Sequence, residues 1–157
     1  MSDIGHADIA PMSQGEAEEI STWRYEAPYD FYDADADRSD FAELLDSERR
    51  GDRYFSARDD AGTLIGHFEF GYRGDVVSVG LGLRPDLTGR GFGRSFLDAG
   101  LSFAEERFEP RLFMLSVAAF NARAITVYER AGFVRTRTFD HETNGGVFSF
   151  IEMERPA

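Results

Sequence analysis

One stretch, Val76 to Arg94, constrains the fold of this chain more than any other. It begins as an apolar run with β-branched residues, VVSVGLGL, which predicts a buried strand. Pro85 ends that strand, and Gly89, Gly91 and Gly93 follow before a helix begins. Alternate glycines let the backbone bend with its amides outward, and a helix start adds free N–H groups and the positive end of its dipole. The stretch therefore predicts a site that can bind phosphate.

Four kinds of structure contain such a glycine turn. A lone GxGxG is most often a turn without a ligand. A dinucleotide fingerprint needs GxGxxG, and Arg94 stands where its third glycine belongs. A P-loop needs a lysine followed by Ser or Thr, and the chain contains no lysine. The fourth is a pyrophosphate-binding turn of the coenzyme A type, and the sequence downstream decides between them.

A second motif lies about thirty residues further on, in LFMLSVAAFNARAITVYERAGF. It is long enough for one strand followed by one helix. A strand is expected to run from Leu112 to Val117. Asn121 is a good N-cap for a short helix, which continues through Tyr128 until Gly132 stops it.

Together, in this order and at this spacing, the two motifs strongly resemble the GNAT family of acyl-CoA-dependent N-acetyltransferases. The resemblance extends from about Arg53 to Phe139. Thr88 departs from it, because the family usually has Gln or Arg there, although the glycine turn still supplies its amides. The matching residues are Pro85, Gly89, Gly91, Gly93, Val117, Asn121, Ala124, Ile125, Tyr128, Gly132 and Phe133.

The resemblance implies an α+β fold: a mixed, mostly antiparallel twisted sheet flanked by helices, splayed between the Val76 and Arg111 strands. We expect residues 1–16 to be a flexible tail and residues 17–157 to be a single domain of this family. The expected element order is β-α-β-β-β-α-β-α-β-β.

Periodicity and turn residues predict the remaining elements. We expect a first strand over Ala17–Tyr25 and a helix over Asp40–Arg50 with a capping box of Asp40 and Glu43, while the segment between them, Glu26–Asp37, is aromatic and acidic and has no helical stripe. A helix follows the glycine turn and ends before Pro110. The expected strands are 53–58 and 63–70, which form a hairpin, and 134–140 and 147–153, which are joined at Asn144-Gly145.

The resemblance also implies where acetyl-CoA binds. Backbone groups left unpaired by the splay, at Leu81, Gly82 and Leu83, are expected to bond its pantetheine arm, with an N–H near Leu83 facing the thioester carbonyl. Asn121 is expected to bond the same arm, or simply to cap its helix. The pyrophosphate is expected on the amides of Gly89, Arg90, Gly91, Phe92, Gly93 and Arg94.

Tyr128 is the expected general acid. A phenol with a pKa near 10 is protonated at neutral pH and can donate as a thiolate of pKa about 8.5 leaves. Outside the motif the same tyrosine would be read as a packed core residue.

No residue stands out as the general base. Glu69 and Asp75 are weak candidates, each more typical of a solvated or turn carboxylate, and His67 and His141 look like ordinary surface or loop residues. A site without a strong base suits an α-amine better than a lysine, because deprotonating a lysine at neutral pH costs roughly 4 kcal/mol. The acceptor cleft is expected near Trp23, Tyr25, Tyr29, Phe31 and Tyr32, which otherwise complete the core.

Composition limits the partners. The chain has no cysteine, which excludes disulfides, thiolate metal sites and a cysteine nucleophile, so acyl transfer would be direct; we expect no metal. With no signal peptide and no run of about 18 apolar residues, a cytoplasmic protein is expected. A net charge of -12 argues against nucleic acid and anionic membranes. Strong acidity without lysine fits either a salt-adapted cytoplasm or a GC-rich genome.

The sequence therefore predicts an N-acetyltransferase that moves an acetyl group from acetyl-CoA directly to a primary amine, as a monomer or homodimer. The acceptor would be a protein or peptide α-amine, or a small-molecule amine. Two alternatives stay open: a sensor that binds acyl-CoA without turnover, and an interaction domain that binds no coenzyme.

Overall fold

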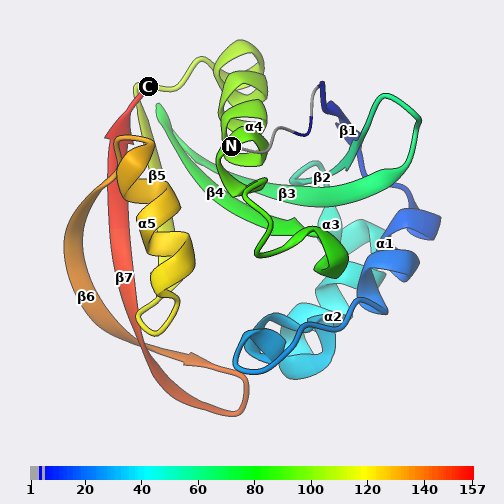
Figure 1. Ribbon diagram of the computed structural model, residues 1–157, viewed down its shortest axis with the longest axis horizontal. Coiled ribbons are helices and arrows are strands. Elements are labelled where there is room, and N and C mark those ends of the chain that lie inside the picture. The colour runs from blue at the N-terminus through cyan, green and yellow to red at the C-terminus, as the bar shows by residue number, and fades with distance from the viewer. Residues whose placement is uncertain (1–3, 5) are drawn as a thin grey trace.

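The computed structural model describes residue 4 and residues 6–157. Its seven-stranded sheet has the order β1-β2-β3-β4-β5-β7-β6, and all neighbours pair antiparallel except β4 and β5, which pair in parallel (Figure 1). This mixed, mostly antiparallel sheet confirms the expected fold class. The strands are β1 Asp8–Pro11, β2 Tyr54–Arg58, β3 Leu64–Arg73, β4 Val76–Leu83, β5 Leu112–Ala118, β6 Val134–Thr143 and β7 Gly146–Pro156.

The helices form two groups around the sheet. Three short helices, α1, α2 and α3, gather near the β1 and β2 end of the sheet, whereas α4 and α5 flank β4 and β5 (Figure 1). The α-helices are α1 Gln14–Ser21, α2 Arg38–Leu45, α3 Ser47–Arg50, α4 Gly93–Phe108 and α5 Ala122–Arg130, and the 3-10 helices are η1 Tyr29–Tyr32, η2 Ala34–Ala36 and η3 Pro85–Leu87.

Two hydrophobic cores form because successive residues of a strand point to opposite faces. Phe55 of β2 belongs to the larger core, where it joins Phe68 of β3 and Phe96 of α4. Its neighbour Tyr54 belongs to the smaller core, which α1 and α2 cover with residues such as Ile20. A strand that is buried on both faces, as β2 is, fixes the helical layers firmly against the sheet.

The N-terminal region differs from the expectation. Residues 8–16, expected as part of a flexible tail, form β1 and the start of α1, and the strand expected over Ala17–Tyr25 is mostly the helix α1. Ser13 and Glu16 make a capping box, and Ala17 and Ile20 are spaced for one buried helix face. Residues 1–3 and 5, also in the expected tail, lie outside the described residues.

The helix expected over Asp40–Arg50 is two helices, α2 and α3. The capping box of Asp40 and Glu43 is wrong, because Asp37 caps α2 by accepting from the Asp40 amide. Asp46 then interrupts the helix and caps α3. Asp side chains compete with the backbone for hydrogen bonds and so favour caps over helix interiors, which explains the break.

The central elements agree with the expectation. β4, α4, β5 and α5 lie where the two motifs predict them, and the turn at Asn144-Gly145 joins β6 to β7 with positive φ angles of 53° and 75°. The β4–β5 ladder runs only from Val76 paired with Leu112 to Ser78 paired with Met114. The two strands separate beyond that point, which confirms the expected splay.

Candidate active site

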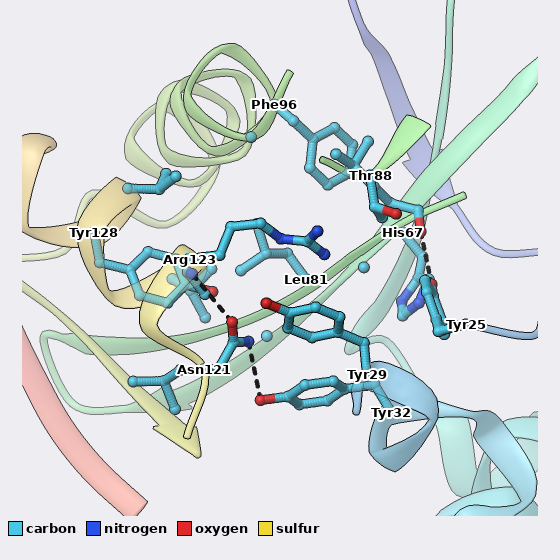
Figure 2. A pocket seen from close by; sticks show the side chains of 18 of the residues that line it. Tyr25, Tyr29, Tyr32, His67, Leu81, Thr88, Phe96, Asn121, Arg123 and Tyr128 are labelled. Carbon is cyan, nitrogen blue, oxygen red and sulfur yellow. Dashed lines mark hydrogen bonds between the residues drawn. The ribbon is translucent and has the colours of Figure 1, made fainter. Parts of the chain in front are cut away.

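A cavity of about 700 Å³ opens where β4 and β5 separate. Figure 2 shows its two walls, with Asn121, Arg123 and Tyr128 of the α5 region on one side and Tyr25, Tyr32 and His67 on the other. Of the residues predicted for the site, the cavity is lined by Leu81, Gly82, Leu83, Gly89, Gly91, Gly93, Asn121 and Tyr128.

Backbone groups of β4 point into the gap. Gly66 pairs with Leu83, and the Arg84 amide donates to the Ile65 carbonyl, so Leu83 is in a pair that exchanges no hydrogen bonds with β3. Its own amide and carbonyl, like those of Leu81 two residues earlier, therefore face away from β3 and toward the splay. The Tyr25 hydroxyl donates to the Leu83 carbonyl over 2.6 Å, whereas the Leu83 amide has no partner among the residues that the structure describes.

The glycine turn places further amides at the mouth of the cavity. Gly89 and Gly91 have φ angles of 69° and 84°, a backbone region that side chains rarely adopt. Phe92 is the N-cap of α4 and supplies no side-chain hydrogen bond, so the amides of the first helical turn stay available to a ligand. This geometry suits an anion such as a pyrophosphate.

Three residues that were predicted for the glycine turn have side chains that point away from the cavity. Arg90 donates to the Asp86 carbonyl and lies over the Phe92 ring. Arg94 bonds Asp98 and the Arg130 carbonyl. Neither arginine nor Phe92 lines the cavity, so the expected contact of these three residues with a phosphate is through their backbone amides and remains a prediction.

Asn121 combines two contacts. Its Oδ1 accepts from the Ala124 amide over 3.1 Å, which caps α5, and its Nδ2 donates to the Tyr32 hydroxyl over 3.1 Å (Figure 2). The side chain is buried and thus ties the start of α5 to the short helix η1 on the opposite wall. The capping role is confirmed, whereas the predicted bond to a pantetheine arm remains a prediction.

Tyr128 lies at the cavity wall on α5, with its ring packed edge-on to Phe133. Burial raises the pKa of its phenol, as does the nearby Tyr32 hydroxyl. The hydroxyl is therefore protonated at neutral pH, as a proton donor must be. Its role as general acid remains a prediction.

Two polar residues of β3, His67 and Glu69, face the cavity. They pair with Gly82 and Gly80 of β4, which carry no side chains, so both polar side chains lie over bare backbone. A Cβ at Gly82 would come within 2.5 Å of the His67 Nε2. Glycines at these two positions thus make room for the polar pair beside the splayed end of β4.

His67 is not the surface or loop residue that the sequence suggested. Its Nδ1 is buried and has no hydrogen-bond partner among the described residues. Burial lowers the pKa of the imidazole to about 4, so the ring is neutral at physiological pH.

Glu69 remains a candidate general base, because it lines the cavity. Burial raises the pKa of its carboxyl, as does the charge of nearby Glu43, while Arg53, at 3.2 Å, opposes the shift. A carboxylate with a raised pKa is a stronger base than an exposed one.

The other two base candidates lie away from the cavity. Asp75 is exposed at the turn between β3 and β4, at the opposite end of β4 from Leu83, and pairs there with Arg111 over 2.9 Å. Asp75 is thus the turn carboxylate that its position in the sequence favoured, and it lies away from the cavity. His141 is exposed on β6 and packs edge-on against Phe150.

The aromatic residues expected at the acceptor cleft divide into two groups. Tyr25, Tyr29 and Tyr32 line the cavity. Trp23 is buried in the smaller core next to His67, and Phe31 packs edge-on against Phe120 and Phe148, outside the cavity. These rings thus divide between the cavity and the core, and an acceptor cleft beside the three tyrosines remains a prediction.

Arg123 is a residue of the cavity wall that the sequence motifs did not single out. Its guanidinium carbon lies 4.0 Å from the centre of the Tyr29 ring, and Nη1 lies 3.0 Å from where a Gly89 Cβ would be. It therefore places a positive charge beside the glycine turn. An arginine two residues after the N-cap Asn121 is a weak signal, since helix surfaces are commonly charged.

Within residue 4 and residues 6–157, no group of three His, Asp or Glu side chains is arranged to hold a metal ion. Nor is any helix in this part of the chain long and apolar enough to cross a membrane.

Comparison with known proteins gives a consistent picture. Residues 16–133 match the model of the acetyltransferase (GNAT) family. A mycothiol acetyltransferase of Propionibacterium freudenreichii is 44% identical over 84 residues, which are 49% of this chain and 26% of that protein. One of Streptomyces coelicolor is 45% identical over 58 residues, 37% of this chain and 18% of that protein. The chain thus spans about a quarter or less of these curated relatives.

Solved structures share the fold at low sequence identity. The Vibrio cholerae spermidine N-acetyltransferase in complex with CoA and spermine is 21% identical, with a TM-score of 0.72, over 96% of this chain and 95% of that chain. A GNAT-family acetyltransferase from Bacillus anthracis is 14% identical, with a TM-score of 0.74, over 96% and 95%.

Proposed function

Because this chain belongs to the acetyltransferase (GNAT) family, we propose that it is an enzyme that transfers an acetyl group from acetyl-CoA directly to a primary amine. The observation that carries the proposal is the gap between β4 and β5, which combines free backbone amides with a glycine turn at the start of α4. Such a gap accepts an extended amide-bearing arm as a strand edge does, while the turn holds its phosphates.

The residues present fit acetyl-CoA. Leu81 and Leu83 offer unpaired backbone groups, and the helix start after Gly91 offers amides for an anion. Arg123 adds an exposed positive charge next to Gly89. In this reading the chain itself supplies no covalent carrier, since it has no cysteine, and transfer from the thioester to the amine is direct.

Three groups of the chain then carry the chemistry. The free amide of Leu83 donates to the thioester oxygen as negative charge develops there. The Tyr128 hydroxyl donates its proton to the departing sulfur. Glu69 accepts a proton from the amine, for which its raised pKa suits it.

The proposed acceptor is an α-amine or a small-molecule amine. An α-amine with a pKa near 8 is partly neutral at neutral pH, whereas a lysine costs roughly 4 kcal/mol to deprotonate. A single carboxylate such as Glu69, already bonded to Arg53, is a modest base for that task. A mycothiol acetyltransferase and a spermidine N-acetyltransferase are among the proteins that this chain resembles, and amine acceptors agree with the second name.

The same reasoning extends to the location, oligomeric state and partners of the proposed enzyme. We propose a cytoplasmic protein, where acetyl-CoA is made, acting as one catalytic domain in a monomer or homodimer. The net charge of -12 makes nucleic acid and anionic membranes poor partners.

The test is a thiol-release assay with acetyl-CoA across a panel of α-amines, small amines and internal-lysine peptides, together with calorimetry of acetyl-CoA binding. We expect binding, and turnover with α-amines or small amines. Binding without turnover on any acceptor would indicate a sensor, and no binding would indicate an interaction domain. Efficient acetylation of internal lysines with α-amines inert would overturn the proposed acceptor class.

A further inference from the structure

Arg123 extends from the first turn of α5 into the cavity, where it lies near Tyr29 (Figure 2). Its guanidinium carbon is over the face of the Tyr29 ring, 4.0 Å from the ring centre. Its Nη1 is 3.0 Å from the position that a Cβ of Gly89 would occupy. The guanidinium therefore lies between Tyr29, the first residue of η1, and the glycine turn.

The charge of Arg123 has no anionic partner in the part of the chain that the structure describes. Arg84 and Arg94, on either side of the glycine turn, form ion pairs with Asp86 and Asp98. Arg123 forms neither an ion pair nor a hydrogen bond with any described residue, and its contact is with a ring face. In a chain with 29 acidic and 17 basic residues, an arginine without a carboxylate is unusual.

The helix dipoles make this position unfavourable for a cation. Arg123 is the second residue of α5, where the positive end of the helix dipole repels a guanidinium. The glycine turn beside it leads into α4 and lies at the positive end of that helix as well. The guanidinium thus adds its charge to that of a helix start, and an anion bound between them would offset both.

Tyr29 supplies the contact that holds the guanidinium in this place. An arginine side chain has several rotatable bonds, and a contact on the face of its guanidinium restricts them. Such a contact leaves the N–H groups, which lie in the plane of the guanidinium, able to donate. No described residue hydrogen-bonds the Arg123 side chain, so the Tyr29 ring is what directs Nη1 toward Gly89.

We propose that Tyr29 is a positioning residue that holds the Arg123 guanidinium against the glycine turn, where the guanidinium bonds a phosphate of the coenzyme. This inference rests on the proposed acetyltransferase function, and it gives a residue of η1, on the acceptor side of the cavity, a part in coenzyme binding. The ligand chemistry is that of a phosphate or pyrophosphate, for which a guanidinium offers two parallel N–H donors.

The experiment is a double-mutant cycle on the Kd of acetyl-CoA, measured by calorimetry without an acceptor, so that no turnover is needed. Arg123→Gln should raise the Kd by about tenfold, as the loss of one charge-assisted contact does. Tyr29→Leu should raise it by about threefold, because it removes the ring face. In the Arg123→Gln background, Tyr29→Leu should change the Kd by less than about 1.5-fold, because the ring acts through Arg123.

Two control variants and a salt series separate this role from a general effect on charge or packing. Tyr29→Phe keeps the ring face and should leave the Kd within about 1.5-fold of wild type. Arg130→Gln removes an exposed arginine from the same helix, outside the cavity, and should do likewise. Raising KCl from about 0.05 to about 0.5 M should weaken binding more in the wild type than in Arg123→Gln, because salt screens the contact that this variant lacks.

The outcomes distinguish failure of this inference from failure of the proposed function. Equal acetyl-CoA affinity of the wild type and Arg123→Gln would remove the phosphate contact while the acetyltransferase proposal stands. A Tyr29→Leu effect as large in the Arg123→Gln background as in the wild type would make Tyr29 a packing residue. No binding to the wild type would overturn the proposed function itself. Thermal melting should show the variants folded, because Arg123 is exposed and Tyr29 lies at the cavity surface.

Discussion

The two walls of the active-site cavity are built in different ways. The wall proposed for the cofactor uses backbone groups of β4, the glycine turn and the start of α4, from the stretch Val76 to Arg94, together with Asn121 and Tyr128 of the α5 region. The wall proposed for the acceptor uses side chains of residues 25–43 and of β3, which meet only through the packing of α1 and α2 on the sheet. A wall built from backbone groups is specified by the residues of one short segment, whereas a wall built from side chains depends on tertiary contacts between distant segments.

This difference suggests distinct sensitivities for the two walls. Changes in the cofactor wall should affect binding or chemistry for every acceptor. Changes in the acceptor wall, Tyr29 excepted, should alter which amine is preferred, or the stability of the fold, and leave acetyl-CoA binding intact. The following predictions test that division.

The largest expected effect is on the proton donor. Tyr128→Phe keeps the ring and its packing on Phe133 and removes only the hydroxyl. We expect acetyl-CoA affinity to be unchanged and the single-turnover rate to fall by roughly 10²–10⁴-fold, as for a lost general acid. Tyr72→Phe, at an exposed position of β3, is the matched control. A single-turnover rate within about twofold of wild type would make Tyr128 a packing residue.

Gly91→Val should disrupt the cofactor wall. The φ angle of 84° is strained for any side chain and most of all for a β-branched one, and the new side chain lies in the expected path of the pyrophosphate. We expect acetyl-CoA affinity to fall by about 100-fold or more, measured by calorimetry. Gly62→Val is the control, because Gly62 has a similar φ of 79° in the turn between β2 and β3. Unchanged affinity in a folded Gly91→Val protein would contradict the phosphate site.

The same division explains which features the sequence predicted. β4, the glycine turn and the Asn121 cap could be predicted because strand composition, positive-φ glycines and capping residues act locally. The splay between β4 and β5 came from the family resemblance, since nothing local in either strand specifies where their ladder ends.

The acceptor wall could be predicted only in outline. His67 looked like a surface residue because its burial depends on Trp23 and the smaller core, which α1 helps to form. The capping box of Ser13 and Glu16 lies in the segment expected to be a tail, so neither α1 nor the core that it covers was predicted. Arg123 was missed because its contact with Tyr29 joins segments far apart in the chain.

His67 should make stability depend on pH. Its pKa is about 4 in the folded protein and near 6.5 when exposed, so between these values the unfolded chain binds a proton that the folded protein does not. Stability is therefore lost as pH falls from about 6.5 to 4, by up to about 3 kcal/mol from this residue. Urea unfolding across that range should show the loss, and His67→Gln should remove this part of it. A slope that His67→Gln leaves unchanged would mean that the imidazole is not the buried neutral group described.

The smallest expected effect concerns the whole surface rather than either wall. A net charge of -12 destabilises the compact state through repulsion among carboxylates, and salt screens exposed charges over about 10 Å at 0.1 M. Molar KCl should therefore raise the melting temperature by a few degrees, as roughly 1 kcal/mol of relieved repulsion would. A melting temperature that stays flat or falls between low and molar KCl would reject salt adaptation and leave genome composition as the reason for arginine without lysine.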